Sequence, residues 1–363
     1  MSTGIEDLEV SAYKIPTDLP ESDGTIEWND TTLILVRLKA GSCEGIGYTY
    51  GAQAIAPLIS STLKPIFMGR DPADVRAINM AMVKAIRNNG QTGLAMMAVS
   101  AIDIALWDLK ARLLGLPLCR LLGQQREGMK IYGSGGFTSY TDEQLRTQLR
   151  GWAEEGIGAV KIKVGRDKEA DQRRVAVARA AIGSATELYV DANGAYTVAE
   201  AVKQAQLFSA YGVSWLEEPV PAQVPGQLTR IRQNLNGQMR IVAGEYGYGP
   251  DDFRTLLTAG AVDVLQADAT RCGGLTGFLK AGHLCEAFRT PLSSHCAPSI
   301  HLHAALSLPW FSIAEYFHDH ILIEQRLFDG PLKPRHGQLF PDLSRPGLGL
   351  FFRQQAAEPY RVA

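Results

Sequence analysis

The sequence predicts an α/β protein in which a parallel (β/α) barrel follows a smaller α+β unit. The chain has 363 residues, enough for about two domains. From about residue 129 onward, short β-rich runs alternate with helix-compatible stretches. Acidic and basic residues stand at the ends of most of these runs, and barrel active sites are built at the carboxyl ends of the strands. These observations favour a barrel over an open doubly wound sheet, which is the main alternative.

Composition and charge argue against several classes of function. Hydrophobic residues make up 46% of the chain and charged residues 20%, so a large core can form. The formal net charge is −2, from 36 Lys and Arg against 38 Asp and Glu, which argues against nucleic acids and anionic membranes as partners. The longest apolar stretch, 93–107, contains Asp103 and falls short of the ~20 residues that span a bilayer. The five cysteines form no CxxC motif, which predicts a cytoplasmic protein without a disulfide scaffold or a structural zinc site.

The first unit is expected over residues 1–125 and combines a strand with helices. Residues 31–38 are rich in β-branched and aliphatic side chains and predict a strand, after a loop over 16–29. Helical patterns follow around 52–66, 71–88 and 93–114, and residues 115–117 end the last of them. The 93–114 pattern is apolar on nearly every face, so we expect this helix to be buried between layers.

The predicted barrel spans residues 126–318. Its eight strands are expected to begin near Lys130, Ala159, Glu187, Val213, Arg240, Val262, Pro291 and Phe311. The clearest helical stretches between them are 142–155, 168–182, 198–211 and 275–288. The tail, 319–363, is rich in Pro and Gly and shows no clear helix–strand unit, so we expect it to pack back on the first unit.

The third, fourth and fifth strands of the predicted barrel each end in a carboxylate: Asp191, Glu217 and Glu245. Neighbouring strand ends lie ~5 Å apart, so the three acids should converge. Converged carboxylates need a neutralising cation, and Mg²⁺ suits an all-oxygen set better than zinc, because no His or Cys belongs to the trio. The alternative is that each acid only caps the next helix, which explains one strand end better than three in a row. Glu218 is one residue out of register, and we assign it to a supporting contact or a salt bridge.

Lys161 and Lys163 lie on the second strand, and the period of two directs both toward the barrel interior. Buried lysines are costly unless function requires them. A second ammonium and Mg²⁺ lower the pKa of a lysine, so Lys163, nearer the strand end, is predicted to be a neutral general base near neutral pH. Lys161 is predicted to help bind a substrate carboxylate. The alternative is a strand edge with snorkelling lysines.

The sixth and seventh strands end in Asp268 and His295. Adjacent strand ends place the carboxylate beside the imidazole, which orients the ring and raises its basicity. His295 is preferred over His301 and His303, because these two fall in the following helix. The eighth strand ends in Glu315, which is predicted to donate a hydrogen bond to a developing enolate oxygen if it is protonated.

Together these residues predict proton abstraction next to a carboxylate. The second and seventh strands lie on roughly opposite sides of the ring, with the cation ligands between them. A substrate carboxylate at the cation therefore has Lys163 on one side of its α-carbon and His295 on the other. Because an α-proton of a carboxylate is only weakly acidic, the enolate needs the metal and nearby donors.

The sequence resembles the mandelate racemase subgroup of the enolase superfamily over almost its whole length. The motifs that carry the resemblance are residues 98–110, Lys161-Ile-Lys163, Asp191-Ala-Asn-Gly, Trp215-Leu-Glu-Glu-Pro, Ala243-Gly-Glu245, Asp268-Ala-Thr-Arg-Cys-Gly-Gly, Ser294-His295 and Pro346-Gly-Leu-Gly-Leu. The resemblance implies a TIM-like (β/α)7β barrel under an N-terminal α+β capping domain. It also implies Mg²⁺ on the three strand-end acids and a site made of Asp191, Glu217, Glu245, Lys161, Lys163, Asp268, His295 and Glu315.

The subgroup includes both racemases and acid-sugar dehydratases, so the resemblance leaves the complete reaction open. We expect an enolate intermediate and favour dehydration of a monocarboxylic sugar acid to a 2-keto-3-deoxy acid, the commoner outcome among such sequences. Racemisation or epimerisation of a 2-hydroxy or related acid and cycloisomerisation of a sugar lactone stay open. Outside the family, a Schiff-base aldolase and a non-catalytic barrel that binds sugar acids are the alternatives.

The specificity loops of the family match residues 15–29 and 47–54. The first contains no Lys or Arg and four acids, Asp18, Glu21, Asp23 and Glu27. A second substrate carboxylate normally needs a cation there, so a monocarboxylate is favoured over a diacid unless Arg166 or Arg271 enters the pocket. Three aromatic residues are expected to pack either on the substrate or on the barrel: Trp28, Tyr48 and Tyr50. The expected partners are a small-molecule carboxylate and further copies of the chain, in a homo-oligomer.

Overall fold

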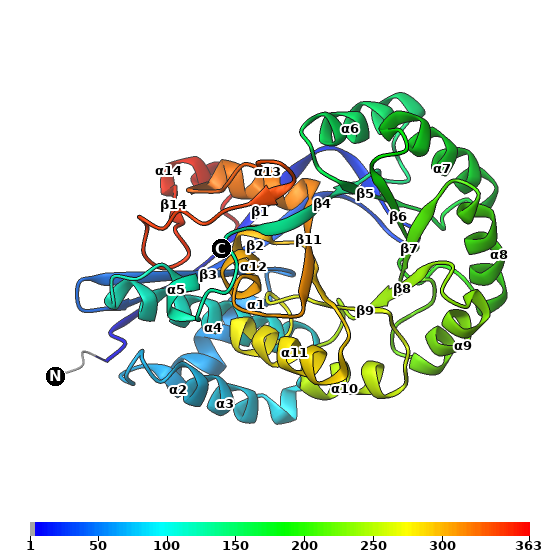
Figure 1. The fold of residues 1–363 in the computed structure, drawn as a ribbon. Coiled ribbons are helices and arrows are strands. Elements are labelled where there is room, and N and C mark those ends of the chain that lie inside the picture. The colour runs from blue at the N-terminus through cyan, green and yellow to red at the C-terminus, as the bar shows by residue number, and fades with distance from the viewer. Residues whose placement is uncertain (1–3) are drawn as a thin grey trace.

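A closed parallel barrel forms the centre of the computed structural model, which describes residues 4–363 (Figure 1). Its strands are β4 (Met129–Gly135), β5 (Ala159–Lys163), β6 (Glu187–Asp191), β7 (Val213–Glu217), β8 (Arg240–Ala243), β9 (Val264–Ala267), β10 (Leu292–Ser294) and β11 (Phe311–Phe317). Each strand pairs in parallel with the next, and β11 pairs with β4 to close the ring. A short strand, β13 (Gln338–Leu339), adds antiparallel to β4. The predicted barrel is confirmed, and all eight strands begin close to their expected starts.

Helices connect the successive strands and cover the outside of the ring (Figure 1). They are α6 (Asp142–Glu154), α7 (Lys168–Ile182), α8 (Val198–Ser209), α9 (Pro225–Leu235), α10 (Pro250–Thr258), α11 (Gly274–Phe288) and α12 (Pro298–Ala305). Thr141 and Thr197 begin α6 and α8 with capping boxes, which satisfy backbone N–H groups at the helix starts. Strands and helices thus alternate in the (β/α)7β order from β4 to β11.

Apolar side chains fill the interior of the barrel beneath its charged residues. Tyr132, Tyr189 and Trp215, from β4, β6 and β7, pack together, and the rings of Tyr189 and Trp215 stack with centroids 4.7 Å apart. Small aliphatic residues of β5, β8 and β9 complete this cluster. The Tyr132 hydroxyl accepts a hydrogen bond of 3.4 Å from Lys161 Nζ, so the charged residues rest directly on an apolar floor.

An antiparallel sheet of three strands precedes the barrel: β1 (Asp7–Ser22), β2 (Glu27–Ala40) and β3 (Cys43–Tyr50). The predicted loop over 16–29 is wrong, because this segment is the end of β1, a short turn and the start of β2, with a register shift between Pro16 and Glu21. The two prolines and four acids of the segment interrupt the alternation of apolar and polar residues by which a strand is predicted. In Figure 1 the long blue ribbons of β1 and β2 run across to the barrel.

The turn between β1 and β2 is held in shape and tied to the barrel. Asp23 Oδ1 accepts hydrogen bonds from the backbone N–H groups of Thr25 (2.6 Å) and Ile26 (2.8 Å). The backbone N–H of Thr138, after β4, donates to the carbonyl oxygen of Ser22 at 2.8 Å. This turn, with residues 51–54 after β3, forms the lid of the site described below.

The N-terminal unit also contains helices, of which α1 and α4 contact the sheet: α1 (Ile55–Leu58), η1 (Ile59–Leu63), α2 (Lys64–Phe67), α3 (Val75–Ala85), η2 (Arg87–Asn89), α4 (Gly93–Leu113) and α5 (Leu118–Leu121). The long helix α4 packs against β2, β3 and the barrel helix α11, and it is buried along most of its length. Its predicted burial between layers is confirmed, and it joins the capping sheet to the barrel.

The tail contains more regular structure than the sequence predicts. Residues 318–327 form α13 (His318–Leu327), followed by β12 (Phe328–Asp329), β14 (Phe351–Phe352), α14 (Gln354–Ala357) and η3 (Glu358–Tyr360). Helix α13 lacks a side-chain N-cap, and its buried residues follow one another closely instead of forming one apolar face. The sequence therefore shows neither a start signal nor an amphipathic pattern that would predict this helix. The tail contacts the N-terminal unit, where Arg361 bridges to Tyr13 and Gly347 bridges to Pro117.

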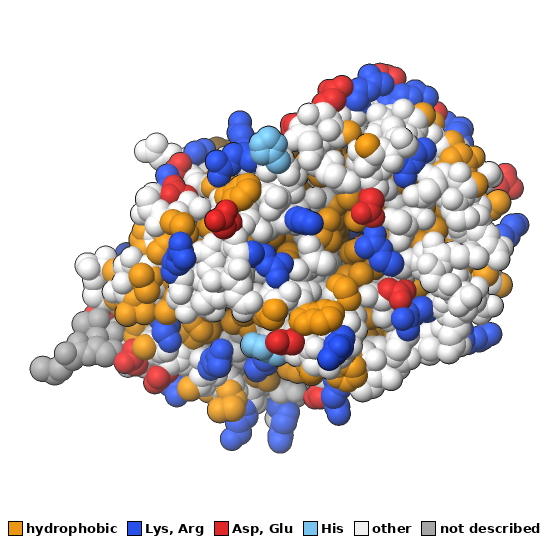
Figure 2. All heavy atoms as spheres, viewed as in Figure 1, with side chains coloured by type: hydrophobic (Ala, Val, Ile, Leu, Met, Phe, Trp, Pro, Cys, Tyr) orange, Lys and Arg blue, Asp and Glu red, His pale blue; other side chains and the backbone are white. Residues whose placement is uncertain are grey.

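The surface carries mixed charge. On the face shown in Figure 2, basic and acidic side chains are interspersed among polar and apolar ones. This pattern agrees with the formal net charge of −2. Within residues 4–363, no helix is both long and apolar enough to cross a lipid bilayer.

Asp108 in α4 links three parts of the chain, and its replacement by Asn tests this link. Its carboxylate accepts hydrogen bonds from the backbone N–H groups of Ile46 (2.8 Å) and Leu348 (2.7 Å) and from Arg112 Nε (2.7 Å). An amide offers one acceptor atom and turns an N–H toward these donors. We expect Asp108→Asn to lower the free energy of unfolding by about 3 kcal/mol, because a buried N–H that loses its partner costs ~1–3 kcal/mol.

Urea unfolding followed by circular dichroism measures this loss. Asp74→Asn is the matched control, since Asp74 is exposed at the start of α3 and makes no capping bond. The control should change stability by less than ~0.5 kcal/mol. Equal stability of the two variants would show that Asp108 does not hold these segments together.

Candidate active site

Three carboxylates converge at the carboxyl ends of neighbouring barrel strands. Asp191 and Glu217 are the last residues of β6 and β7 and are register partners, while Glu245 follows β8. All three are buried, and one oxygen of each lies within 4.8 Å of the others. The structure thus brings together the acids that the strand ends singled out.

Gly244 makes the approach of Glu245 sterically feasible. Its φ is +133°, and a Cβ at this position would lie 2.2 Å from the carbonyl oxygen of Gln266 on β9. Side chains are excluded by both conditions, so only glycine lets the chain turn this closely against β9. The close packing against β9 therefore requires the glycine of the Ala-Gly-Glu motif, separately from the role of the glutamate.

Two lysines of β5 sit among these acids. Lys161 Nζ pairs with Glu217, with Glu315 Oε1 at 2.7 Å and with Asp191 Oδ2 at 3.6 Å. Lys163 Nζ lies 2.6 Å from Asp191 Oδ2. Both side chains point into the barrel, as the period of two predicts, and neither snorkels to solvent.

The predicted lowering of the Lys163 pKa depends on Mg²⁺ beside the ammonium and stays a prediction, while the protein groups alone shift this pKa the other way. Burial alone lowers the pKa of both ammonium groups, but the adjacent carboxylates outweigh it. Glu217 and Glu315 raise the pKa of Lys161 well above its usual value, and Asp191 raises that of Lys163. Lys161 is fully buried and is not among the residues that line the cavity described below, and its contact with a substrate carboxylate stays a prediction.

Asp268 and His295 form the predicted pair. His295 Nδ1 lies 2.8 Å from Asp268 Oδ2, and His295 Nε2 lies 3.4 Å from Glu245 Oε2. Burial lowers the pKa of His295, but Glu245 and the bond to Asp268 outweigh it, so the pKa is raised. Burial raises the pKa of Asp268, yet its hydrogen bond to His295 and the nearby charges bring that pKa below its usual range.

The other two candidate histidines have structural partners. His301 Nε2 accepts a hydrogen bond from the backbone N–H of Ala269 at 2.8 Å, and its Nδ1 lies 3.0 Å from the carbonyl oxygen of Cys296. His303 lies between the backbone of Cys119 and that of Leu348. Both fall within α12, as predicted.

Glu315 is held as a carboxylate, which corrects the expectation of a protonated acid. Its Oε1 accepts a hydrogen bond from Ser134 Oγ at 2.6 Å and pairs with Lys161. Its Oε2 accepts one from the backbone N–H of Cys296 at 2.7 Å. Burial raises the pKa of Glu315, but Lys161 and His295 overcome this, and the pKa lies well below its usual value.

The acid trio fits a hard divalent cation. Glu245 Oε2 and Glu218 Oε1 are buried without a hydrogen-bond donor. Burial raises the pKa of Glu217 to about 8 against the opposing effect of Lys161, and burial with Glu245 and Asp191 raises that of Glu218. A donor set made only of carboxylate oxygens suits Mg²⁺.

A cavity of about 340 Å³ opens beside these groups, and Lys163, Glu245, His295 and Asp268 lie in its wall. Residues of the lid complete it, among them Asp23, Ile26, Trp28, Tyr50, Gly51 and Ala52. Arg271 also lines the cavity, with its guanidinium 3.4 Å from Glu245 Oε1 and 3.7 Å from Asp268 Oδ2. Arg166 lies outside this lining and donates to Glu27 at 2.8 Å.

The three lid aromatics differ in role. Tyr50 lines the cavity, stacks on His320 with centroids 3.5 Å apart, and has a buried hydroxyl without a partner. Trp28 also lines the cavity, and its Nε1 donates to Glu21 at 2.8 Å. Tyr48 is a core residue, because its buried hydroxyl donates to Glu324 at 2.6 Å.

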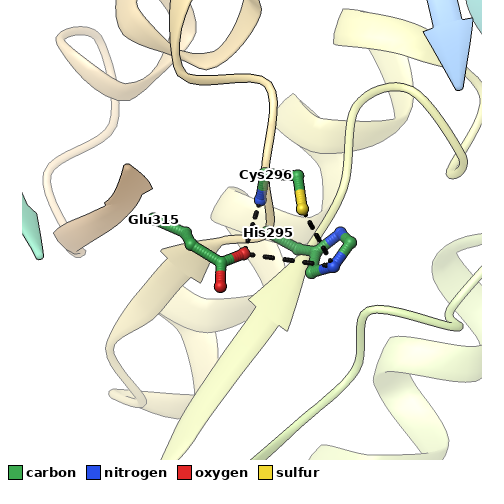
Figure 3. Close-up of side chains that lie close together, drawn as sticks. All are labelled: His295, Cys296 and Glu315. Atoms are coloured by element: carbon green, nitrogen blue, oxygen red, sulfur yellow. Dashed lines mark hydrogen bonds and ion pairs between the residues drawn. The ribbon is translucent and has the colours of Figure 1, made fainter. Parts of the chain in front are cut away.

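Asn193 and Cys296 are two of the lining residues to which sequence reasoning assigns no role. Asn193 lines the cavity with a buried, unpartnered Oδ1, and its φ of +46° within the Asp-Ala-Asn-Gly motif is a signal for its special position. Cys296 places Sγ 3.2 Å from His295 Nε2, and Figure 3 shows the thiol and the Glu315 carboxylate both facing that ring. Nothing in the sequence distinguishes Cys296 from the other cysteines.

The Asp268–His295 contact predicts a measurable shift. In Asp268→Asn, the imidazolium loses a charged hydrogen-bond acceptor, so the pKa of His295 should fall. NMR titration of histidine-labelled, metal-free protein measures it, with His295→Asn to assign the signal. The signal of His303 should not shift, because its ring nitrogens contact the backbone of Cys119 and Leu348 and neither member of this pair. An unchanged or higher pKa of His295 would contradict the assigned coupling.

Comparison with known proteins agrees with this architecture. Residues 12–123 match the N-terminal domain model of mandelate racemase / muconate lactonizing enzyme, and residues 144–356 match the enolase C-terminal domain-like model. A solved mandelate racemase/muconate lactonizing enzyme-like protein from Rubrobacter xylanophilus is 48% identical over 99% of both chains, with a TM-score of 0.97. A racemase from Streptomyces coelicolor A3(2), solved with bound magnesium, is 30% identical with a TM-score of 0.92, over 99% of this chain and 100% of that one.

A curated relative adds a lyase to this set. The L-talarate/galactarate dehydratase of Salmonella typhimurium is 31% identical over 97% of this chain and 90% of its own length. The two family models together cover most of the sequence, including the acid trio, both lysines of β5, Asp268, His295 and Glu315. The chain therefore belongs to the mandelate racemase/muconate lactonizing enzyme family of the enolase superfamily.

Proposed function

We propose that the protein is a Mg²⁺-dependent enzyme that removes the proton α to a carboxylate and forms an enolate. The observation that carries the proposal is that Lys163 and His295 line one cavity and contact different members of the acid trio. Lys163 Nζ lies 2.6 Å from Asp191, and His295 Nε2 lies 3.4 Å from Glu245. Relatives of the chain are lyases and isomerases, and the chain is an enzyme of one of these two classes.

Asp191, Glu217 and Glu245 would hold the Mg²⁺, which when bound supplies positive charge that stabilises an enolate. Lys161 supports these ligands from below, since its ammonium pairs with Glu217 and Asp191 within the barrel. Its third partner, Glu315, connects the same ammonium to the wall that carries His295. We assign Lys161 and Glu315 to holding this charged layer in place.

Lys163 and His295 would move protons on opposite sides of the substrate α-carbon. Lys163 accepts a proton only as a neutral amine, so Asp191 must first turn from the lysine to other partners. His295 is oriented by Asp268 through Nδ1, which leaves Nε2 facing the cavity as the atom that accepts or donates. In a dehydration, the first base takes the α-proton and an acid protonates the departing β-hydroxyl.

The lining of the cavity supports a hydroxylated monocarboxylic acid as substrate. The hydroxyl of Tyr50 and the amide oxygen of Asn193 are buried, unpartnered and neutral, which suits sugar hydroxyls. Besides Lys163, to which we assign the role of base, Arg271 is the lining cation that would suit a second carboxylate, and it is already paired with Glu245 and Asp268. We therefore favour dehydration of an aldonate-type sugar acid to a 2-keto-3-deoxy acid.

Racemisation or epimerisation is the second candidate. Two bases that flank one α-carbon can remove the proton from one face and return it to the other. This outcome needs no leaving group, and the racemase from Streptomyces coelicolor among the relatives is consistent with it.

A sugar-acid library assayed with Mg²⁺ distinguishes these outcomes. We expect a member of the library to give a 2-keto-3-deoxy product in a colorimetric assay, and to exchange its α-proton with deuterium in D₂O. Polarimetry of the same reactions detects racemisation, which the colorimetric assay misses. A turnover that survives EDTA while borohydride traps Lys163 would instead indicate a Schiff-base aldolase.

Once a substrate is known, each base can be removed separately. Lys163→Ala and His295→Asn should each lower kcat by about 10³-fold, because positioned general bases contribute 10²–10⁴-fold. Lys203→Ala and His283→Asn are matched controls on exposed positions of α8 and α11, and both should keep wild-type activity. Full activity in Lys163→Ala or His295→Asn would refute the role of that residue.

A further inference from the structure

We propose that His295 Nε2, Cys296 Sγ and Glu315 Oε2 form a second metal site, which binds a thiophilic divalent cation of the zinc type. The three ligand atoms lie within 4.8 Å of one another; His295 and Cys296 directly follow β10, and Glu315 lies on the neighbouring strand β11 (Figure 3). This site goes beyond the proposed reaction, which uses the all-oxygen trio and requires no sulfur ligand.

The spacing of the donors suits a small tetrahedral ion. Cys296 Sγ lies 3.2 Å from His295 Nε2, and that nitrogen lies 3.9 Å from Glu315 Oε2. Sulfur, nitrogen and oxygen ligands of tetrahedral zinc lie ~3.3–3.6 Å apart, as follows from zinc–ligand bonds of ~2.0–2.3 Å. Only small shifts are therefore needed to bring the three atoms to one ion.

The backbone holds Cys296 in position without a metal. Cys296 and Ala297 have φ values of +50° and +38°, which is a left-handed pair that side chains rarely adopt. His301 Nδ1 lies within hydrogen-bond distance of both carbonyl oxygens, at 3.0 and 2.9 Å. The backbone N–H of Cys296 donates to Glu315 Oε2 at 2.7 Å. This strained turn directs the thiol back toward the ring of the preceding histidine.

Neighbouring side chains orient the proposed ligands by hydrogen bonds and ion pairs. Asp268 occupies His295 Nδ1 at 2.8 Å, which leaves Nε2 as the ligand atom, and carboxylate–histidine pairs of this kind orient metal ligands. Glu315 is fixed through its other oxygen by Ser134 and Lys161. His295 and Cys296 both line the cavity, so an ion reaches the site from solvent, and the thiol proton leaves to water as sulfur binds.

The two metal sites differ in chemistry. Imidazole and thiolate favour zinc and cadmium, whereas the Asp191–Glu217–Glu245 trio offers only oxygen and favours magnesium. The sites also adjoin, since His295 Nε2 lies 3.4 Å from Glu245 Oε2. An ion on His295 would occupy the nitrogen that the proposed reaction needs. Zinc would therefore act as an inhibitor that blocks His295 while magnesium stays bound.

Cadmium titration tests the site without any substrate. With Mg²⁺ at saturating concentration, Cd²⁺ should produce a thiolate-to-cadmium charge-transfer band in the ultraviolet that saturates at one equivalent. Cys296→Ser should abolish the band. Cys43→Ser, which removes a partly exposed thiol on β3, is the matched control and should retain it. Circular dichroism checks that each variant is folded.

A second variant tests whether the thiol binds the metal without help from the histidine. His295→Asn keeps the sulfur but removes a metal ligand. Losing a residue that only orients a ligand weakens metal binding by up to ~100-fold, so the loss of His295 should weaken Cd²⁺ binding by at least that factor. The proposal is overturned if wild-type protein gives no band below millimolar Cd²⁺, if Cys296→Ser retains it, or if His295→Asn binds as tightly as wild type. Because no turnover is measured, failure of this site leaves the proposed reaction untouched, and the reverse also holds.

Discussion

The layer of opposite charges at the carboxyl end of the barrel is the feature on which the rest of the structure depends. Lys161 and Lys163 are buried beside Asp191, Glu217 and Glu315, on a floor of aromatic side chains. Removing one partner from a buried ion pair costs ~3–5 kcal/mol, because the other charge is left without compensation. These charged groups therefore stabilise one another only as a set.

The layer contains more carboxylates than ammonium groups, and this determines which ligands it favours. Lysine pairs satisfy Asp191 and part of Glu217, while Glu245 Oε2 stays buried without a donor and faces the imidazole of His295. The negative charge that remains favours a cation, and a cation favours an anionic substrate in the adjoining cavity. Lys163 and His295 reach that cavity from different sides of the trio. The lid closes over it with neutral donors and acceptors and with acids that already have partners.

The barrel and the trio were predictable because both follow from local signals. Each strand is a short apolar run that ends in a polar residue, and parallel strands bring their ends to one rim. The β1–β2 hairpin was not predictable in the same way, since Pro16 and the lid acids break the alternation in the strands that form it. Helix α13 was missed for a related reason, because it has no N-cap and no regular polar face.

Protonation states were the least predictable property of the site. The sign of the Lys163 pKa shift depends on a contact of 2.6 Å with Asp191, and sequence spacing places the two residues on adjacent strands without giving their distance. Glu315 is similar, since Lys161 and the Cys296 backbone hold it as an anion. The position of Cys296 depends on a strained turn, and the conformational preferences of its residues do not predict this turn.

The most direct test of the account is a high-resolution crystal structure of the protein grown with Mg²⁺. The account predicts one ion bound at about 2.0–2.1 Å by an oxygen of each of Asp191, Glu217 and Glu245. Lys163 Nζ should then have moved away from Asp191 Oδ2, while Lys161 should remain paired with Glu315. Carboxylates that stay bound to the two lysines with no ion among them, at a magnesium concentration that saturates relatives, would contradict it.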